Sequence, residues 1–134
     1  MILLDTHVLL WLRLNSPQLG RRARNSLDRA WPAGDAAVST WTFWEVAMLV
    51  AKGRLGVDID VLRWRVEVLA DGLVEVPVSG DIAVRAPLLA DMHGDPADRV
   101  IAATAITLSD CRLLTADERL LDWPGHLERL DART

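Results

Sequence analysis

The chain has 134 residues, the length of one ordinary domain, and its 51% apolar and 25% charged residues are typical of a folded globular protein, which excludes the disordered class. A net charge of −4 argues against a protein that coats nucleic acid by bulk attraction. The single cysteine, Cys111, excludes an internal disulfide and fits a cytoplasmic location. We expect one domain over residues 1–134.

Short apolar runs alternate with helical patterns along the chain. An apolar run of three or four residues is too short for a helix and predicts a buried strand, whereas caps, prolines and glycines delimit the helices. In chain order the predicted elements are a strand at 2–4, helices at 6–14 and 16–30, a strand at 36–39, helices at 40–52 and 60–71, a strand at 73–76, helices at 81–92 and 95–108, a strand at 112–115, a helix at 116–122 and a strand at 127–130. This alternation predicts an α/β domain with a central, mainly parallel sheet flanked by helices on both faces.

The N-terminal stretch MILLDTHVLLWLRL is apolar, but Asp5, His7 and Arg13 interrupt it. It has neither a basic leader nor a small-residue cleavage site, and this favours core segments over a signal peptide or a membrane span. We therefore expect no membrane partner.

Four acidic residues fall where ligand sites form in such sheets, at the carboxyl ends of the strands. Asp5 directly follows the first strand, and Asp117 lies just beyond the strand at 112–115. Asp98 is in the first turn of the helix that leads into that strand, and in a right-handed crossover this helix begins near the same edge. Glu45 lies deeper in its helix, but its long side chain leans toward the helix N-terminus. The four acids can therefore converge.

Each acid also has a purely structural interpretation. Asp5 and Asp117 can cap short helices, and Asp98 suits the third position of a helix that Asp95 caps. Glu45 can form an ion pair with an arginine. Without a partner, its carboxylate would be costly in free energy in the apolar surroundings of its helix. These interpretations do not explain why all four acids should fall at one edge.

Clustered carboxylates repel one another unless cations hold them together. Hard divalent cations prefer oxygen ligands, so Mg²⁺ or Mn²⁺ suits a site of aspartates and a glutamate. The three histidines and Cys111 have no spacing that indicates a zinc site. A water-accessible Mg²⁺ site, with one metal or two, suits phosphodiester hydrolysis.

Three segments resemble a known family in sequence and in order. They are MILLDTHVLLW, VSTWTFWEVAMLVAKGRL and HGDPADRVIAATAITLSDCRLLTAD, and together they resemble the PIN-domain ribonucleases, in particular the VapC toxins of toxin–antitoxin pairs. The resemblance covers nearly the whole chain. It implies a PIN-like fold, Mg²⁺- or Mn²⁺-dependent endoribonuclease activity on RNA such as tRNA or rRNA, a homodimer, and silencing by a cognate antitoxin.

The resemblance also assigns the site residues. It matches the family's four acids to Asp5, Glu45, Asp98 and Asp117. We expect Asp5 and Asp98 to ligate metal directly, and Glu45 and Asp117 to bind through water or to complete a second site. The supporting residues are expected to be Thr6, Thr115 and Arg99, with Arg99 contacting either phosphate or an acidic side chain.

The tryptophans and arginines indicate base stacking and phosphate or partner contacts only weakly. Trp41 and Trp44 are expected to be core around Glu45 rather than base-stacking residues, because their helix is apolar nearly all round. The arginines within 21–29 form either a solvated helix face or a surface that contacts phosphate or a partner.

Two alternatives to a ribonuclease toxin remain open at this point. One is a catalytically inactive PIN-like interaction domain, for which four intact acids would have no use. The other is a different Mg²⁺-dependent phosphoryl-transfer enzyme with a nucleophilic aspartate, but that type usually has a second aspartate where this chain has His7. The RNA target and the antitoxin are not determined by the sequence.

Overall fold

The fold is organised around a five-stranded sheet in which every neighbouring pair of strands is parallel. In this computed structural model, which describes all 134 residues, the strand order is β3-β2-β1-β4-β5. The strands are β1 (Ile2–Leu4), β2 (Ala36–Ser39), β3 (Val74–Val76), β4 (Arg112–Thr115) and β5 (Glu128–Asp131). The predicted parallel α/β sheet is confirmed.

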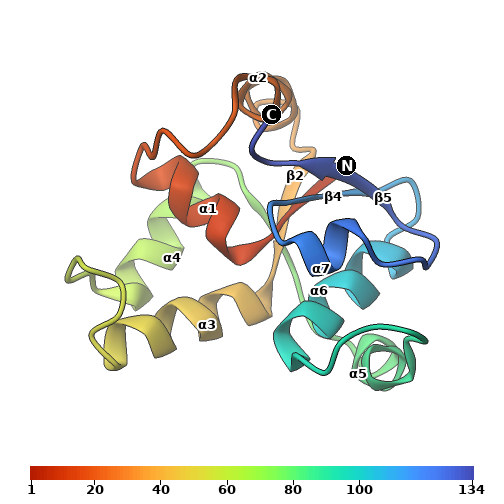
Figure 1. Ribbon diagram of the computed structural model, residues 1–134. Helices are drawn as coiled ribbons and strands as arrows, with labels where there is room; N and C mark the ends of the chain where they lie inside the picture. The colour runs from red at the N-terminus through yellow and green to blue at the C-terminus, as the bar shows by residue number, and fades with distance from the viewer.

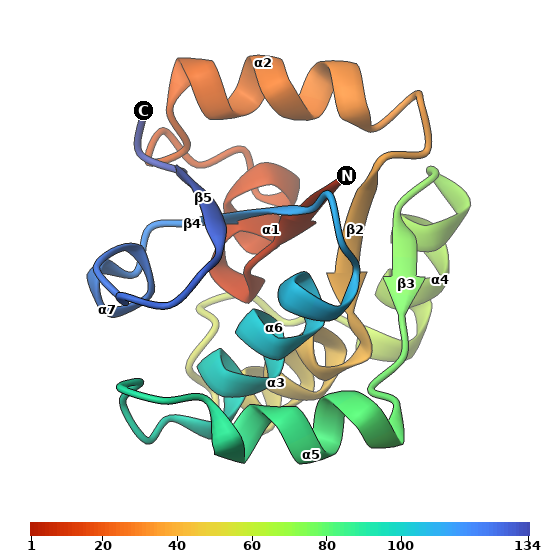
Figure 2. The same cartoon turned by 90° about the vertical axis from the view of Figure 1, so that its right-hand side faces the viewer.

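Seven helices flank this sheet (Figures 1 and 2). They are α1 (Thr6–Arg13), α2 (Arg21–Ala30), α3 (Thr40–Ala51), α4 (Val61–Ala70), α5 (Gly80–Leu88), α6 (Pro96–Thr107) and α7 (Glu118–Leu121). Figure 1 shows α1 and α4 on one side of the strands and α5, α6 and α7 on the other. None of the helices is long and apolar enough to cross a bilayer.

The central strands are buried on both faces, and their side chains alternate between two apolar clusters. Ile2 and Leu4 of β1 pack with α1, α2, α3 and α4 in one cluster. Leu3, between them, packs with α6 and α7 in the other. Helix α5 lies outside α6, where Ile82 and Ala86 contact Ala103. Helices therefore cover both faces, as predicted, and the carboxyl ends of β1, β2 and β4 meet at one edge.

The segment at 16–20 departs from the predicted helix. Helix α2 begins only at Arg21, because Gly20 is extended and its backbone N–H donates to the carbonyl of Ala132 at 2.8 Å. A Cβ on Gly20 would lie 2.5 Å from the carbonyl carbon of Arg133. A contact with the C-terminal segment after β5 thus overrides the local Ser16-Pro17 helix-start signal.

The helix predicted at 81–92 also ends earlier, at Leu88. Pro87 lies in its last turn, and proline removes a backbone donor and crowds the preceding turn. The chain after Leu88 is therefore irregular, and it leads to Asp95, which caps α6 by accepting from the backbone N–H of Ala97 at 3.0 Å.

Candidate active site

The carboxyl edge of the sheet brings together side chains from four helices and the strand β4. Asp5 and Asp117 are the N-caps of α1 and α7, Asp98 lies in the first turn of α6, and Glu45 lies in α3. Asp5 and Asp98 are buried, although carboxylates are rarely buried without partners. The capping roles considered for Asp5, Asp95 and Asp117 are confirmed, and they coexist with the convergence of the acids.

Asp5 is held by two hydrogen bonds that use both of its oxygens. Oδ1 accepts from the backbone N–H of Thr6 at 2.8 Å, and Oδ2 accepts from the hydroxyl of Thr115 at 2.7 Å. The Thr115 oxygen in turn accepts from the backbone N–H of Asp117 at 3.1 Å. Thr115 therefore links two of the acids, and its hydroxyl orients the Asp5 carboxylate.

Glu45 is oriented by a chain of two buried hydroxyls. Its Oε1 accepts from Thr6 Oγ1 at 2.6 Å, and Thr6 Oγ1 lies 3.0 Å from Thr42 Oγ1. Because the Thr6 hydroxyl has one proton and gives it to Glu45, Thr42 must be the donor to Thr6. Thr6 therefore supports Glu45 as well as capping its own helix.

Burial raises the pKa of Glu45 from 4.5 to about 7, against the opposing effect of the Thr6 hydrogen bond. Repulsion from Asp5 and Asp98 contributes to this rise. The pKa of Asp98 is raised to about 6, first by burial and then by the charges of Asp5, Asp95 and Asp117, while a hydrogen bond to His93 lowers it. The acids thus interact electrostatically as one group.

Asp98 is contacted by two side chains, His93 and Arg119, that we did not predict as part of the site. His93 Nε2 lies 2.6 Å from Asp98 Oδ2, and Arg119 Nη2 lies 3.4 Å from the same oxygen. Arg119 also pairs with Asp117 at 3.2 Å. Burial tends to raise the pKa of Asp117, but the hydrogen bonds and charge of Arg119 outweigh it and lower that pKa.

Arg99 is placed differently from what we expected. Its guanidinium donates to five backbone carbonyl oxygens and to no acidic side chain. The acceptors lie between α5 and α6 and in the last turn of α5; they are the carbonyls of Ala86, Pro87, Leu89, Met92 and His93. Arg99 therefore supports the site by holding the irregular segment that carries His93 beside Asp98.

His7 and Thr42 were also missed as members of the site. His7 Nε2 accepts from the backbone N–H of Ala116 at 2.9 Å, which leaves its proton on Nδ1, 3.6 Å from Asp5 Oδ2. A signal for them was present, because His7 lies two residues after Asp5, Arg119 two residues after Asp117, and Thr42 three residues before Glu45. On a helix, residues three apart share a face, as Thr42 and Glu45 do. Asp5 and Asp117 are N-caps with extended backbone, so the contacts of His7 and Arg119 with them depend on the geometry of the helix start.

The prediction that Trp41 and Trp44 are core is wrong for Trp44. This side chain is 52% exposed, and Trp41 is only half-buried. The two rings stack with centroids 4.8 Å apart and planes inclined by 21°. The arginine-rich helix α2 presents Arg21, Arg22 and Arg29 to solvent.

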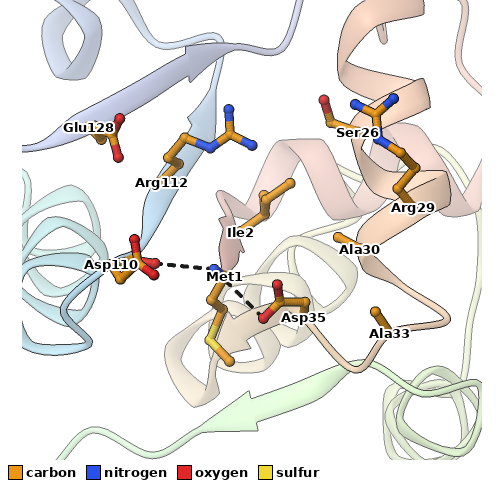
Figure 3. Close-up of a pocket in the computed structure, with 10 residues that line it drawn as sticks. All are labelled: Met1, Ile2, Ser26, Arg29, Ala30, Ala33, Asp35, Asp110, Arg112 and Glu128. Atoms are coloured by element: carbon orange, nitrogen blue, oxygen red, sulfur yellow. Dashed lines mark hydrogen bonds and ion pairs between the residues drawn. The ribbon is translucent and has the colours of Figure 1, made fainter.

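A second polar hollow, of about 370 Å³, lies at the opposite, amino edge of the sheet (Figure 3). There the Met1 amine lies 3.7 Å from Asp35 Oδ1, and the guanidinium groups of Arg29 and Arg112 flank the same space. The acidic groups of this hollow alternate with cations along an open surface. It therefore lacks the buried, mutually repelling acids of the carboxyl edge.

The donors at the carboxyl edge suit a divalent cation. They are carboxylate and hydroxyl oxygens, and the raised pKa values of Glu45 and Asp98 show that their negative charge is only partly compensated. No three His, Cys, Asp or Glu side chains converge closely enough to enclose an ion by themselves. Mg²⁺ usually keeps several waters and needs only one or two carboxylates, so the donor set fits it.

Comparison with known proteins agrees with the geometry. The chain is 35% identical over 120 residues to Ribonuclease VapC22 of Mycobacterium tuberculosis, covering 89% of this chain and 88% of that protein. A toxin–antitoxin complex from Klebsiella pneumoniae contains a similar fold, with a TM-score of 0.64 and 27% identity over 98% of both chains. FitAcB from Neisseria gonorrhoeae is similar at a TM-score of 0.66 and 25% identity, again over 98% of both chains.

VapBC2 from Rickettsia felis, bound to a promoter DNA fragment, shares the fold at a TM-score of 0.67 and 18% identity, over 98% of this chain and all of that one. The family description that matches the sequence is the PIN domain, over residues 2–125. These matches span almost the whole chain, including every acid of the carboxyl edge. The chain belongs to the PIN-domain family.

Proposed function

We propose that this protein is a divalent-metal-dependent endoribonuclease and the toxin of a toxin–antitoxin pair. The observation that carries the activity is the convergence of Asp5, Glu45, Asp98 and Asp117 at one partly buried edge, with the pKa of two of them raised toward neutrality. The similarity to Ribonuclease VapC22 over most of both chains supports RNA as the substrate. An inactive interaction domain would have no use for such a costly cluster of acids.

We assign direct contact with Mg²⁺ or Mn²⁺ to Asp5 and Asp98, and contact through water or a second cation to Glu45 and Asp117. The bound cation would lower the pKa of an attacking water and stabilise charge on the phosphate. Thr6 and Thr115 hold the carboxylates in position through their hydroxyls. With a pKa of about 7, Glu45 can accept a proton near neutral pH.

His93 and Arg119 both engage Asp98 Oδ2. Direct ligation by Asp98 therefore requires its carboxylate to turn or these partners to withdraw. Arg119 is exposed, and its guanidinium can face the phosphate instead.

A protein antitoxin is the partner that we propose, because the Klebsiella relative is part of a toxin–antitoxin complex. We also propose a homodimer. The RNA that is cut and the cut position are left to sequencing of the RNA ends that the purified enzyme produces.

Cleavage of labelled RNA by purified protein, with Mg²⁺, Mn²⁺ or EDTA, tests the activity. Asp98→Asn should lose at least about 100-fold in rate while keeping its circular dichroism spectrum, because removing the charge weakens metal binding and costs about 3 kcal/mol or more. Asp28→Asn, an exposed aspartate on α2, is the matched control and should cleave normally. Full activity of Asp98→Asn, or undiminished cleavage in EDTA, would contradict the proposal.

The toxin assignment has its own test. The protein encoded beside this gene should co-purify with the chain and inhibit its RNA cleavage. A ribonuclease that is active but has no inhibitory neighbour would be a free-standing nuclease, and only the toxin assignment would fail.

A further inference from the structure

The stacked pair of Trp41 and Trp44 lies on the exposed side of α3, next to a proposed catalytic residue. Trp44 immediately precedes Glu45, and about half of its surface is open to solvent. Tryptophan is enriched at interfaces because its ring offers a large apolar surface, and contiguous exposed apolar area marks interaction sites. The stack with Trp41 holds the Trp44 ring in one orientation at little further entropic cost.

A groove of about 230 Å³ runs along α3 from this ring. Its lining consists of Trp44, Glu45, Met48, Leu49, Lys52 and Arg54. Glu45 is therefore both a wall of the groove and a member of the acid cluster, so the groove adjoins the candidate active site at this residue. Since an α-helix rises 1.5 Å per residue, the groove extends about 12 Å between Trp44 and Lys52.

The far end of the groove is basic. Lys52 and Arg54 are exposed, and neither side chain takes part in an ion pair. Lys52 is the only lysine of a chain whose net charge is −4. Two free cations beside a cluster of acids provide the local attraction that an anionic polymer needs at this surface.

We propose that this groove is a nucleotide subsite for single-stranded RNA next to the cut phosphate. In it, one base stacks on the exposed face of Trp44, and the neighbouring backbone phosphates contact Lys52 and Arg54. This inference rests on the proposed ribonuclease activity and names the part of the substrate that the site holds. Stacking tolerates any base, so the subsite orders the strand without selecting a sequence.

The charges of the groove favour a nucleic acid over a second copy of the chain. In a symmetric dimer centred on the groove, the same surface of each copy would meet, and Lys52 and Arg54 would approach their own counterparts. An apolar partner helix would cover these cations without pairing them, which is costly. A phosphate backbone pairs them and leaves the aromatic face for a base.

The test compares binding of two fluorescent oligomers by anisotropy in EDTA at low salt, so that metal-dependent cleavage is absent. One is a single-stranded RNA, and the other is an abasic oligomer of the same length. Trp44→Ala should weaken binding of the RNA about tenfold, within the range for loss of one stacked base, and should not change binding of the abasic oligomer. Trp44→Phe should restore most of the affinity, and Leu62→Ala, an exposed apolar residue on α4, should have no effect.

The cations are tested by the salt dependence of the same binding. Arg54→Gln should lower the slope of log affinity against log salt by about one, because one phosphate contact is lost. Arg63→Gln on α4, which is also exposed and outside the groove, is the matched control.

Equal weakening of both oligomers by Trp44→Ala, or no weakening of either, would overturn the subsite. So would a change from dimer to monomer in sedimentation with unchanged RNA affinity, which would identify the face as an interface between copies. The subsite stands without the proposed function if binding depends on Trp44 but the wild-type protein cleaves no RNA with metal. The subsite is wrong and the proposed function stands if the wild-type protein cleaves RNA and Trp44→Ala binds and cleaves RNA equally well.

Discussion

The two edges of the parallel sheet carry acidic residues in opposite settings. At the amino edge, Asp35, Asp110 and Glu128 are exposed, and the Met1 amine and Arg112 lie among them (Figure 3). At the carboxyl edge, by contrast, burial and repulsion raise the pKa of Glu45 and Asp98, although His93 and Arg119 lie beside Asp98.

This difference shows that the number of acids does not distinguish a site from a solvated surface. Water screens charges that are exposed, whereas a buried carboxylate keeps most of its interaction with its neighbours. The carboxyl edge therefore has the buried, interacting carboxylates that the proposed cation and proton acceptor require, and the amino edge does not. Three experiments test whether the two edges differ in function.

The largest effect should come from exchanging one aspartate at each edge for asparagine. Asp5→Asn should slow RNA cleavage about 1000-fold, equivalent to about 4 kcal/mol, because the variant loses a charge at the metal. The fold should survive, since asparagine is also a good N-cap. Asp35→Asn should cleave within twofold of wild type. Comparable losses in single-turnover cleavage by both variants would show that the two edges do not differ in function.

Divalent metal should raise the thermal stability of the protein through the carboxyl edge. At a concentration of 100 times its dissociation constant, Mg²⁺ or Mn²⁺ would stabilise the fold by about 2.7 kcal/mol, which corresponds to a rise of several degrees in Tm. Asp98→Asn should lose most of this rise, whereas Asp35→Asn should retain it. If melting curves with and without millimolar metal coincide for the wild-type protein, the carboxyl edge is not a metal site.

The smallest effect concerns pH in the absence of metal. The folded-state pKa of Glu45 is about 7, above its ordinary value of 4.5, so the folded protein holds this proton more tightly than the unfolded chain does. The resulting stability is fully present below pH 4.5 and is lost as the pH rises to about 7. We expect a loss of about 2 kcal/mol, allowing for partial screening of the shift.

Urea unfolding in EDTA at pH 4.5 and pH 7.5 measures this loss. Glu45→Gln should flatten the pH dependence, although the pKa of Asp98, raised to about 6, leaves a remainder. Glu128→Gln, which changes an exposed glutamate of the amino edge, should behave as wild type. A free energy of unfolding that rises with pH over this window in the wild-type protein would show that the Glu45 carboxyl is not destabilised by burial.

Much of the fold and the positions of the acids could be predicted from the sequence. The run Ile2–Leu4 is too short for a helix and too apolar for an exposed strand, so a buried strand followed by Asp5 was the simplest interpretation. The parallel topology then brought Asp98 and Asp117 to the same edge. The start of α2 was not predictable in this way, because it depends on Gly20 meeting the C-terminal segment, more than one hundred residues away.

The contacts around the site also could not be predicted from neighbouring residues in the sequence. Thr115 meets Asp5 across 110 residues, and Arg119 reaches Asp98 across 21. The exposure of Trp44 depends on which elements cover α3, and its apolar neighbours in sequence suggested the opposite. Arg99 illustrates the same point, since its five acceptors are carbonyls that only the fold brings around it.

The alternation of strands and helices can be predicted from the sequence, and with it the edge at which Asp5, Glu45, Asp98 and Asp117 gather. Periodicity and caps are local properties of the sequence, and the parallel connection of the strands then brings their carboxyl ends to one edge. The hydroxyl that orients each carboxylate, the shift of each pKa and the exposure of Trp44 follow only from the folded arrangement. These properties depend on burial and on contacts between distant segments, and a linear pattern of residue types does not contain them.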